Sequence, residues 1–514
     1  MDAEPQTTRR SQRRRSGDAA PSLHQLPWQL VTNPYPPMAI ISADQLESIH
    51  EASLQVLQEI GTRVLLREAR EIYRAGGATV DDGTMQVRFE RGLIEQALAT
   101  VPSQFTLHAR NPDRNVTMGG RHVVFATTAG TPNVSDLAGG RRPGNFQDYC
   151  NLLKLAQSLN IVHVNGGYVP EPIDIPVPVR HLKAGQAMLT LSDKALWAFT
   201  FAPQRMRDTF EMVRIARGID ESRMLAEASF YTVVNTNSPL QLDQAMAWGV
   251  IEMARLGQAV CITPFTLAGA MAPVTLAGAL VQQNAEALGA IVLSQLVRKG
   301  APLIYGGFTS NVDMRTGSPA FGTPEYVQGA IIGGQLARRY SIPYRSSNVN
   351  AANTVDAQAT YESAMSIWGA MMGGVNLMLH GTGWLEGGLT ASYEKYIVDA
   401  EMLQTMSMVM RPLQVDKGTM ALDAIRDVGP GGHFFGTAHT LERYREAFYT
   451  PLLSDWSNFE QWTAAGSVDT TQRAHRIWKT MIAQYEQPAM DPARAEELEA
   501  FVDRRCREGG ADIE

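Results

Sequence analysis

A histidine, a tryptophan and a glutamate follow one short β-rich run near residue 380. His380 closes the run 375–379, and Trp384 and Glu386 come soon after it across a glycine turn. A tryptophan ring attracts a quaternary ammonium group through its negative face, and a nearby carboxylate adds a second attraction for the cation. Taken singly, a buried histidine or an aromatic residue at a strand end also fits an ordinary structural role. Together these residues predict part of a site for a small cation.

Other β-rich runs end in side chains of the same kinds. Asn348 and Asn350 follow the run 344–347, and either amide, together with His380, is suited to bind a carboxylate at the far end of such a ligand. Further rings and one more amide follow or lie within other runs: Tyr168, Phe201, Tyr231, Asn235, Phe265 and Phe308. The ends of the runs therefore predict an aromatic and neutral polar pocket.

The residues of familiar catalytic mechanisms are missing from these positions. We find no Gly-x-Ser-x-Gly elbow, Walker loop or metal-ligand cluster, so we assign no catalytic residue and expect no metal. Lys194 and Lys299 precede their runs, which places them at the opposite rim. A lyase or hydrolase would need a lysine such as Lys194, or a metal, in the pocket. A betaine-binding protein without catalytic activity is a further alternative.

Eight β-rich runs alternate with helix-forming stretches over nearly 290 residues. Because a parallel crossover needs a dozen or more residues, this spacing predicts a parallel sheet, and eight strands close a (β/α)8 TIM barrel. An open doubly wound sheet is the alternative. The runs are Val123–Ala126, Ile161–Asn165, Leu196–Phe201, Ala228–Val234, Ala259–Thr263, Pro302–Gly306, Tyr344–Ser347 and Val375–His380. The active site of such a barrel lies at the carboxyl ends of its strands.

The barrel is expected to occupy residues 121–390 of an α/β chain with two extensions. Residues 1–40 are predicted as a disordered tail and a strap, with an RNA-binding or anionic-surface arm as the alternative role for the arginines at 9–15. Residues 41–120 form an N-terminal mixed α/β extension that begins with an amphipathic helix over 42–60, capped by Ser42. Residues 391–514 form a C-terminal helical extension.

Composition narrows the class of protein. The 514 residues include 45 basic and 52 acidic ones, and a net charge of −7 argues against nucleic-acid binding. Three separated cysteines do not form a disulfide framework, which predicts a cytoplasmic protein. No run reaches the roughly 20 apolar residues that span a membrane. We also expect a homo-oligomer.

Several long segments resemble the trimethylamine methyltransferase family. The similarity covers about residues 40 to 505 and is carried by Thr263–Ser318, Pro319–Glu325 (PAFGTPE), Val355–Glu362 (VDAQATYE), Ser392–Met402 (SYEKYIVDAEM), Val428–His439 (VGPGGHFFGTAH) and Phe459–Arg504. The resemblance implies a (β/α)8 barrel that moves a methyl group from a methylated amine to the cobalt of a corrinoid (cobalamin). The corrinoid is carried by a separate partner protein, and none is bound tightly by this chain.

One departure from the family bears on the substrate. The archaeal trimethylamine enzymes carry pyrrolysine near the end of a late barrel strand, and here that position falls within Ser346–Asn353, where only ordinary residues stand. Members without pyrrolysine resemble methyltransferases of glycine betaine and related betaines. The resemblance therefore implies a quaternary amine, with trimethylamine or another methylated amine as the alternative.

Overall fold

A closed ring of parallel strands forms the centre of the molecule. The computed structural model describes residues 23–199 and 202–511. Neighbouring strands are paired in parallel around the ring. In chain order they are β7 (His122–Thr127), β10 (Leu196–Trp197), β11 (Phe230–Val234), β13 (Ala259–Ile262), β15 (Leu303–Gly306), β18 (Tyr344–Ser347) and β19 (Leu377–Thr382).

The second position of the ring is held by a single residue. Val164 bridges Ala126 of β7 and Ala195 before β10, both in parallel, and this closes the ring at eight positions. The predicted (β/α)8 barrel is confirmed, whereas the predicted strand Ile161–Asn165 is reduced to this one bridge. The chain then passes β7 so closely that a Cβ on Gly166 would lie 2.1 Å from the Thr127 carbonyl oxygen. Pairing stops at that point.

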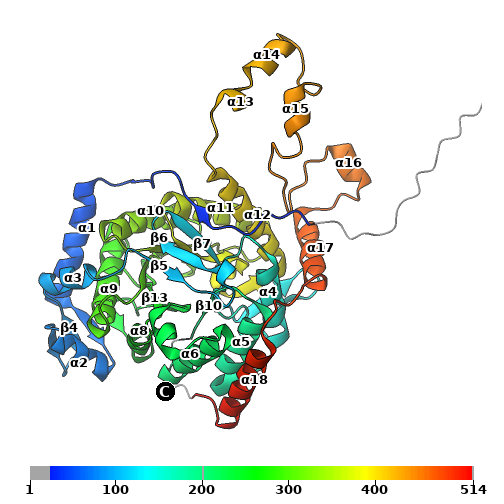
Figure 1. Cartoon of the computed structure of the whole chain (residues 1–514). Coiled ribbons are helices and arrows are strands. Elements are labelled where there is room, and N and C mark those ends of the chain that lie inside the picture. The colour runs from blue at the N-terminus through cyan, green and yellow to red at the C-terminus, as the bar shows by residue number, and fades with distance from the viewer. Residues whose placement is uncertain (1–22, 200–201, 512–514) are drawn as a thin grey trace, which may run out of the picture.

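A helix follows each position of the ring, and the helices surround the sheet (Figure 1). They are α4 (Phe146–Ser158), α5 (Val177–Leu191), α6 (Pro203–Arg217), α8 (Gln244–Arg255), α9 (Leu276–Val297), α10 (Pro324–Arg339), α11 (Ala357–Met372) and α12 (Tyr393–Val409), with the short α7 (Glu221–Ala226) between α6 and β11. Helix α5 lies between the predicted runs Ile161–Asn165 and Leu196–Phe201, where the sequence analysis did not locate a helix. Within residues 23–199 and 202–511, one helix, α9, is long and apolar enough to cross a membrane, but it packs in the barrel and 72% of its most apolar window is buried.

The residues before the barrel form three helices and a small sheet, which pack against the outside of the barrel. Helix α1 (Ala43–Gln55) begins at a capping box on Ser42, as predicted, and continues as a π-helical turn to Ile60. Helices α2 (Arg67–Ala75) and α3 (Arg91–Leu98) pack with α1 against α9. Strands β2 (Thr62–Val64), β3 (Thr79–Asp81) and β4 (Gln86–Arg88) form a small sheet with β12 (Gln241–Leu242).

A strap and a hairpin lie at the amino ends of the barrel strands. Strand β1 (Val31–Thr32) pairs antiparallel with the start of β7 at His122 and Val123. Strands β5 (Gln104–Leu107) and β6 (Val116–Gly119) form a hairpin whose apolar side chains join those of the barrel interior. This end of the barrel is therefore filled by protein, which leaves the opposite end for a site.

Two small sheets lie beside the carboxyl ends of the barrel strands. Strands β8 (Asn133–Asp136) and β9 (Gly140–Pro143) form a hairpin, which joins β20 (Trp384–Leu385) and β21 (Thr390–Ser392) in one sheet. Strands β14 (Leu267–Ala268), β16 (Ser310–Val312) and β17 (Pro319–Ala320) form another. These loops surround the mouth of the barrel.

After α12 the chain leaves the barrel as a long arm and then returns. The arm, residues 411–450, carries α13 (Lys417–Met420), α14 (Leu422–Val428) and α15 (Ala438–Arg443), and it stands clear of the body in Figure 1. Helices α16 (Phe459–Ala464), α17 (Thr470–Ala483) and α18 (Pro492–Arg507) follow. Helix α17 packs on α12, and α18 packs on α5 and α6.

Candidate functional site

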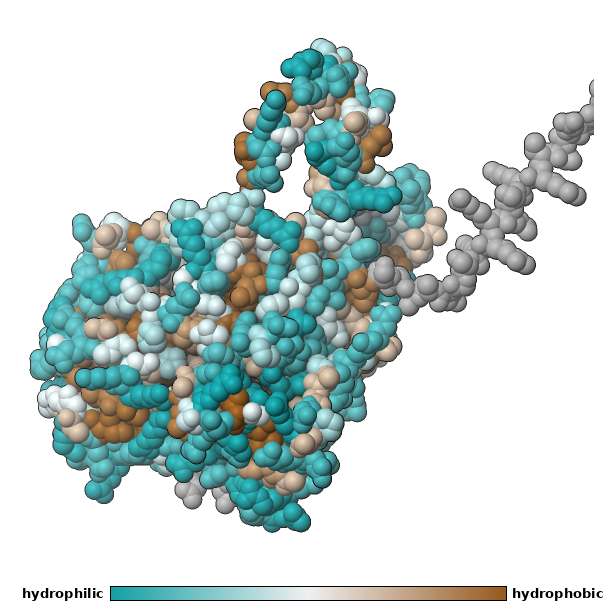
Figure 2. All heavy atoms as spheres, viewed as in Figure 1, coloured by the Kyte–Doolittle hydropathy of each residue, from teal (hydrophilic) through white to brown (hydrophobic). Residues whose placement is uncertain are grey.

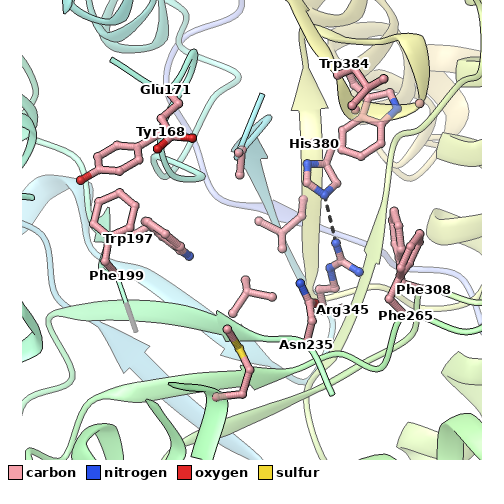
Figure 3. Close-up of a pocket in the computed structure, with 18 of the residues that line it drawn as sticks. Tyr168, Glu171, Trp197, Phe199, Asn235, Phe265, Phe308, Arg345, His380 and Trp384 are labelled. Atoms are coloured by element: carbon pink, nitrogen blue, oxygen red, sulfur yellow. Dashed lines mark hydrogen bonds between the residues drawn. The ribbon is translucent and has the colours of Figure 1, made fainter. Parts of the chain in front are cut away.

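A cavity of about 680 Å³ opens at the carboxyl ends of the barrel strands. It is lined by six of the predicted site residues, which come from separate loops and strands: Tyr168, Asn235, Phe265, Phe308, His380 and Trp384. Figure 3 shows several of these side chains converging from both sides of the opening. Tyr231, by contrast, is fully buried and donates its hydroxyl to the Asn165 carbonyl oxygen, and Phe201 lies outside the described residues.

His380 sits at an irregularity near the end of β19. The pairing register of β19 with β7 shifts between Met378 and Thr382, and His380 has a φ of 57°. Such left-handed backbone is uncommon in residues other than glycine, although histidine tolerates it better than most. The distortion places the imidazole in the cavity wall, with its ring centroid 4.2 Å from that of Trp384.

Arg345 is a buried charged residue of the cavity wall that the sequence analysis did not predict. It lies within β18, is only 2% exposed, and its Nη2 lies 3.2 Å from Nε2 of His380. Its Nη1 donates to the Gly307 carbonyl oxygen at 3.3 Å, and its guanidinium lies 4.8 Å from the centroid of the Phe308 ring. Among the described residues, no carboxylate forms an ion pair with Arg345, and its Nε has no hydrogen-bond partner.

The contact between these two residues fixes the state of the imidazole. A guanidinium can only donate hydrogen bonds, so Nε2 of His380 is the acceptor and Nδ1 carries the proton. Burial, reinforced by the positive charge of Arg345, holds the pKa of His380 well below its ordinary value. Burial also lowers the pKa of Arg345, yet a guanidinium remains charged in proteins. The wall therefore presents a neutral imidazole and a buried positive charge.

Aromatic rings form two walls on opposite sides of the cavity. Phe265 and Phe308 lie with ring centroids 5.1 Å apart, and Trp384 lies 6.2 Å from Phe308 on the side nearer Arg345. Trp197 and Phe199, with centroids 4.3 Å apart, form the other wall together with Tyr168 (Figure 3). Each wall offers ring faces to a methylated cation.

Three of the predicted binding residues do not line the cavity. Glu386 forms an ion pair with Arg141 of the β8–β9 hairpin at 2.8 Å. Asn348 donates to the Gly381 carbonyl oxygen at 3.1 Å, and Asn350 donates to the Trp384 carbonyl oxygen at 2.7 Å. All three therefore hold the segment 381–386 in place, and their contacts are with protein groups.

A buried ion pair supports the same segment from behind. Lys395 and Asp399, one turn apart on α12, form an ion pair and are both fully buried. The second carboxylate oxygen of Asp399 accepts the Gly383 N–H at 2.8 Å. Lys395 also donates to Ser363 at 2.8 Å, and Ser363 in turn accepts from Asn350 at 3.2 Å. The loop that carries Trp384 is thereby fixed on several sides.

The remaining charges near the opening are paired or held by backbone groups. Glu171 and Arg180 form an ion pair at the cavity rim. Arg205 also lines the cavity and donates to the carbonyl oxygens of Val177 and Ala511. Four further lining residues were not predicted as site residues. Trp197 and Phe199 lie within the predicted run Leu196–Phe201, Glu171 lies in the loop after the second run, and Arg180 lies on α5.

The lining offers no obvious nucleophile from this chain. Among the described residues that line the cavity there is no lysine, cysteine, serine, threonine or aspartate. Lys194 lies elsewhere, where its ammonium donates to the carbonyl oxygens of Ala156 and Leu159 at the end of α4. The one described cluster with metal-ligand geometry, Glu47–His50–Glu51, lies on α1 and not in the cavity.

A pocket at the carboxyl ends of eight parallel strands places this chain among the (β/α)8-barrel enzymes that act on small substrates. The family model described as trimethylamine methyltransferase (MTTB) matches residues 6–510. The chain therefore belongs to the trimethylamine methyltransferase family, and it is a methyltransferase.

Two relatives by sequence agree with this assignment. The glycine betaine methyltransferase of Desulfitobacterium hafniense strain Y51 is 39% identical over 93% of this chain and 99% of the relative. A trimethylamine methyltransferase of Desulfitobacterium hafniense strain DCB-2 is 30% identical over 92% and 95%. The solved monomethylamine methyltransferase of Methanosarcina barkeri matches with a TM-score of 0.48 and 11% identity over 89% of this chain and 92% of that one.

Proposed function

We propose that this chain transfers a methyl group from a betaine, glycine betaine or a close analogue, to the reduced corrinoid of a partner protein. The observation that carries the proposal is Arg345, a buried cation in the cavity wall without a carboxylate partner among the described residues. Leaving a buried charge unpaired is costly, so the site is suited to a ligand that brings its own anion. The likeness to a glycine betaine methyltransferase agrees with such a ligand.

The two ends of a betaine match two neighbouring parts of the cavity. The carboxylate would accept hydrogen bonds from the guanidinium of Arg345, which can bind it with two parallel N–H donors. In glycine betaine a single methylene separates the carboxylate from the ammonium. The ammonium would therefore lie close to Arg345, against the wall of Phe265, Phe308 and Trp384.

The cavity is suited to a nucleophile that arrives from outside. A corrinoid with reduced cobalt supplies a strong nucleophile for the methyl carbon, and the lining described above supplies none. The residues of this chain would orient one N–CH₃ bond toward the mouth and exclude water from it. No general acid is needed, because the leaving group is a neutral tertiary amine. Neutral His380 agrees with this requirement.

Moderate binding of the cation favours turnover. Contacts with the ammonium stabilise the substrate more than the transition state, in which the positive charge declines, so a cage of acids would slow the reaction. The wall near Arg345 provides rings and a neutral imidazole, and the nearest predicted acid, Glu386, is already paired with Arg141.

Two alternatives fit less well. Trimethylamine carries no anion and would leave Arg345 without a partner. A lyase or hydrolase would need Lys194 or a metal in the pocket, and Lys194 is held at the end of α4. A betaine-binding protein without activity would make the same contacts with its ligand, so only an activity assay distinguishes it from a methyltransferase.

We also propose a cytoplasmic location, which the free thiols of Cys150, Cys261 and Cys506 support.

The test is a methyl-transfer assay with defined acceptors. The purified chain is mixed with reduced free cobalamin and glycine betaine, choline or trimethylamine, and the absorbance of the methylated product is followed. We expect product with glycine betaine and little with the other two amines. Failure with every betaine, also in the presence of the cognate corrinoid protein, contradicts the proposal. Calorimetric binding of glycine betaine without transfer would favour the binding-protein alternative.

A further inference from the structure

The arm, residues 411–450, exposes far more apolar surface than a free segment should. Leu413, Phe435 and Phe448 are 84–85% exposed. Nine large apolar side chains of the arm are at least half exposed: Leu413, Val415, Met420, Leu422, Ile425, Phe435, Leu441, Tyr444 and Phe448. Figure 2 shows brown side chains on both limbs of the arm, away from the body. Exposed apolar surface of this extent is typical of an interaction site.

A second apolar surface lies on the barrel near the root of the arm. Tyr361, Met365 and Trp368 of α11 follow helical spacing and are 58%, 45% and 38% exposed. The one charged residue within α11, Glu362, is buried and accepts the Ala351 N–H. An outer barrel helix normally turns charged residues to water. We call Tyr361, Met365 and Trp368 the α11 face.

The arm and the α11 face lie on the same side of the molecule. Figure 1 shows α11 and α12 together where the arm departs. The strap joins them, because Tyr35 donates to the Val409 carbonyl oxygen at the end of α12 and the Met38 N–H donates to Met372 at the end of α11. One side of the barrel therefore carries both a protruding apolar segment and an uncovered apolar helix.

We propose that the arm clasps a second copy of this chain by lying across its α11 face. In a twofold pair each arm would cover the α11 face of the other copy. The dimer would then contain two equivalent contacts, and no arm or α11 face would remain exposed. An aromatic side chain buries roughly 150–250 Å², and a stable interface needs about 800 Å² from each partner. The exposed apolar side chains of the arm are sufficient for that area.

The point at which the arm leaves the barrel, at the end of α12, favours a second copy of this chain over the corrinoid protein as the partner of the arm. Helix α12 starts after the loops of the cavity mouth and ends beside the strap that pairs with the start of β7. The arm thus leaves from the rim opposite to the mouth, whereas a corrinoid carrier must approach the mouth. The arm also contains five basic and five acidic residues, so it carries no net charge that would select an oppositely charged partner.

The test measures mass in solution for the full chain and two matched sets of variants. Light scattering after gel filtration should give about twice the 56.3 kDa chain mass for the wild type. Phe435→Asp/Phe448→Asp alters the arm, and Met365→Asp/Trp368→Asp alters the α11 face. Each should raise the dissociation constant at least tenfold. Val274→Asp/Met314→Asp replaces two residues that are 70% and 71% exposed elsewhere and should leave the dimer intact.

Mixing the two defective variants separates exchange between copies from folding back within one copy. A mixed pair retains one sound contact, between the intact arm of one copy and the intact α11 face of the other. We therefore expect partial recovery of the dimer on mixing, with thermal melting confirming that both variants are folded. A monomeric wild type, a dimer that survives the arm substitutions, or a dimer that survives the α11 substitutions would each overturn the proposal.

Discussion

Nη2 of Arg345 lies 3.2 Å from Nε2 of His380, so that a buried guanidinium donates to a neutral imidazole at the wall of the cavity. The two residues stand on adjacent strands, β18 and β19, which pair in parallel. His380 orients the guanidinium without neutralising it. The positive charge therefore remains available to a ligand, and this arrangement leads to the first prediction.

Arg345→Gln should weaken glycine betaine binding by about 10- to 100-fold, because a hydrogen bond to a charged group contributes about 1.5–3 kcal/mol. Choline has the same ammonium but no carboxylate, so it should lose no affinity. Arg180→Gln is the matched control, since Arg180 lines the same cavity but is paired with Glu171. Calorimetric titration of both ligands checks this. Equal losses for choline and betaine would contradict a carboxylate contact at Arg345.

The two aromatic walls should respond differently to the length of the betaine. Trp384 lies on the wall near Arg345, whereas Trp197 lies across the cavity (Figure 3). Trp384→Leu should weaken glycine betaine binding by roughly 2- to 30-fold, which corresponds to a cation–π contact of about 0.5–2 kcal/mol. Trp197→Leu should matter only for betaines with a longer spacer between ammonium and carboxylate. Titrations with betaines of increasing spacer length test this. A large loss of glycine betaine binding in Trp197→Leu would mean that the ammonium of glycine betaine lies against the Trp197 wall and not against the Trp384 wall.

The barrel was predictable from sequence because each strand is a short apolar run and each crossover is long enough for a helix. Helix α5 was missed because its first turn contains Pro178, two residues after Pro176, and this pattern suggests a loop. His380 was predicted because it closes an apolar run, and Trp384 because it follows that run across a short glycine turn. In both cases the information is local to the chain.

Arg345 was missed because a charge inside a buried strand is not expected from local pattern. Its orientation follows from alternation along β18: Tyr344 points outward and donates to the Ala330 carbonyl oxygen on α10, so Arg345 points into the barrel. The role of Glu386 likewise depends on Arg141, which is 245 residues away in sequence. Such long-range partners are not visible in the sequence alone.

The buried pair of Lys395 and Asp399 should matter both for stability and for the site. Lys395→Met leaves the Asp399 carboxylate uncompensated and should reduce the free energy of unfolding by about 3–5 kcal/mol. Lys395→Met/Asp399→Leu should recover most of that loss but still weaken substrate binding, because the Gly383 N–H loses its acceptor. Denaturant unfolding and calorimetric titration measure the two effects.

The exposed ion pair Arg67–Glu71 provides the comparison for that experiment. It has the same spacing along its helix, but its side chains are 84% and 53% exposed. Arg67→Met should therefore change the free energy of unfolding by less than about 1 kcal/mol and leave binding unaltered. If the double variant at Lys395 and Asp399 regained full substrate affinity together with stability, a positioning role for this pair would be excluded.

His163 should make the stability of the fold depend on pH below neutrality. Its Nδ1 accepts the Phe125 N–H at 3.0 Å and its Nε2 lies 3.1 Å from the Gln29 carbonyl oxygen, so it joins the strap to β7 as a neutral ring. Complete burial lowers the pKa of His163 to about 3. In the unfolded chain that pKa is about 6.5, so between these values the unfolded state binds a proton that the folded state does not.

The contribution of neutral His163 to the free energy of unfolding is therefore fully present above about pH 6.5 and declines as the pH falls toward 3. At pH 5 the loss should be about 2 kcal/mol, since the pH is then roughly 1.5 units below the unfolded pKa and each unit corresponds to about 1.4 kcal/mol. His163→Gln removes the titrating group, so the difference in unfolding free energy between wild type and variant should shrink by that amount from pH 7.5 to pH 5. Denaturant unfolding at the two pH values measures it. A difference that stays constant with pH would mean that the imidazole is protonated equally in the folded and unfolded chains, which is incompatible with a neutral His163 between the strap and β7.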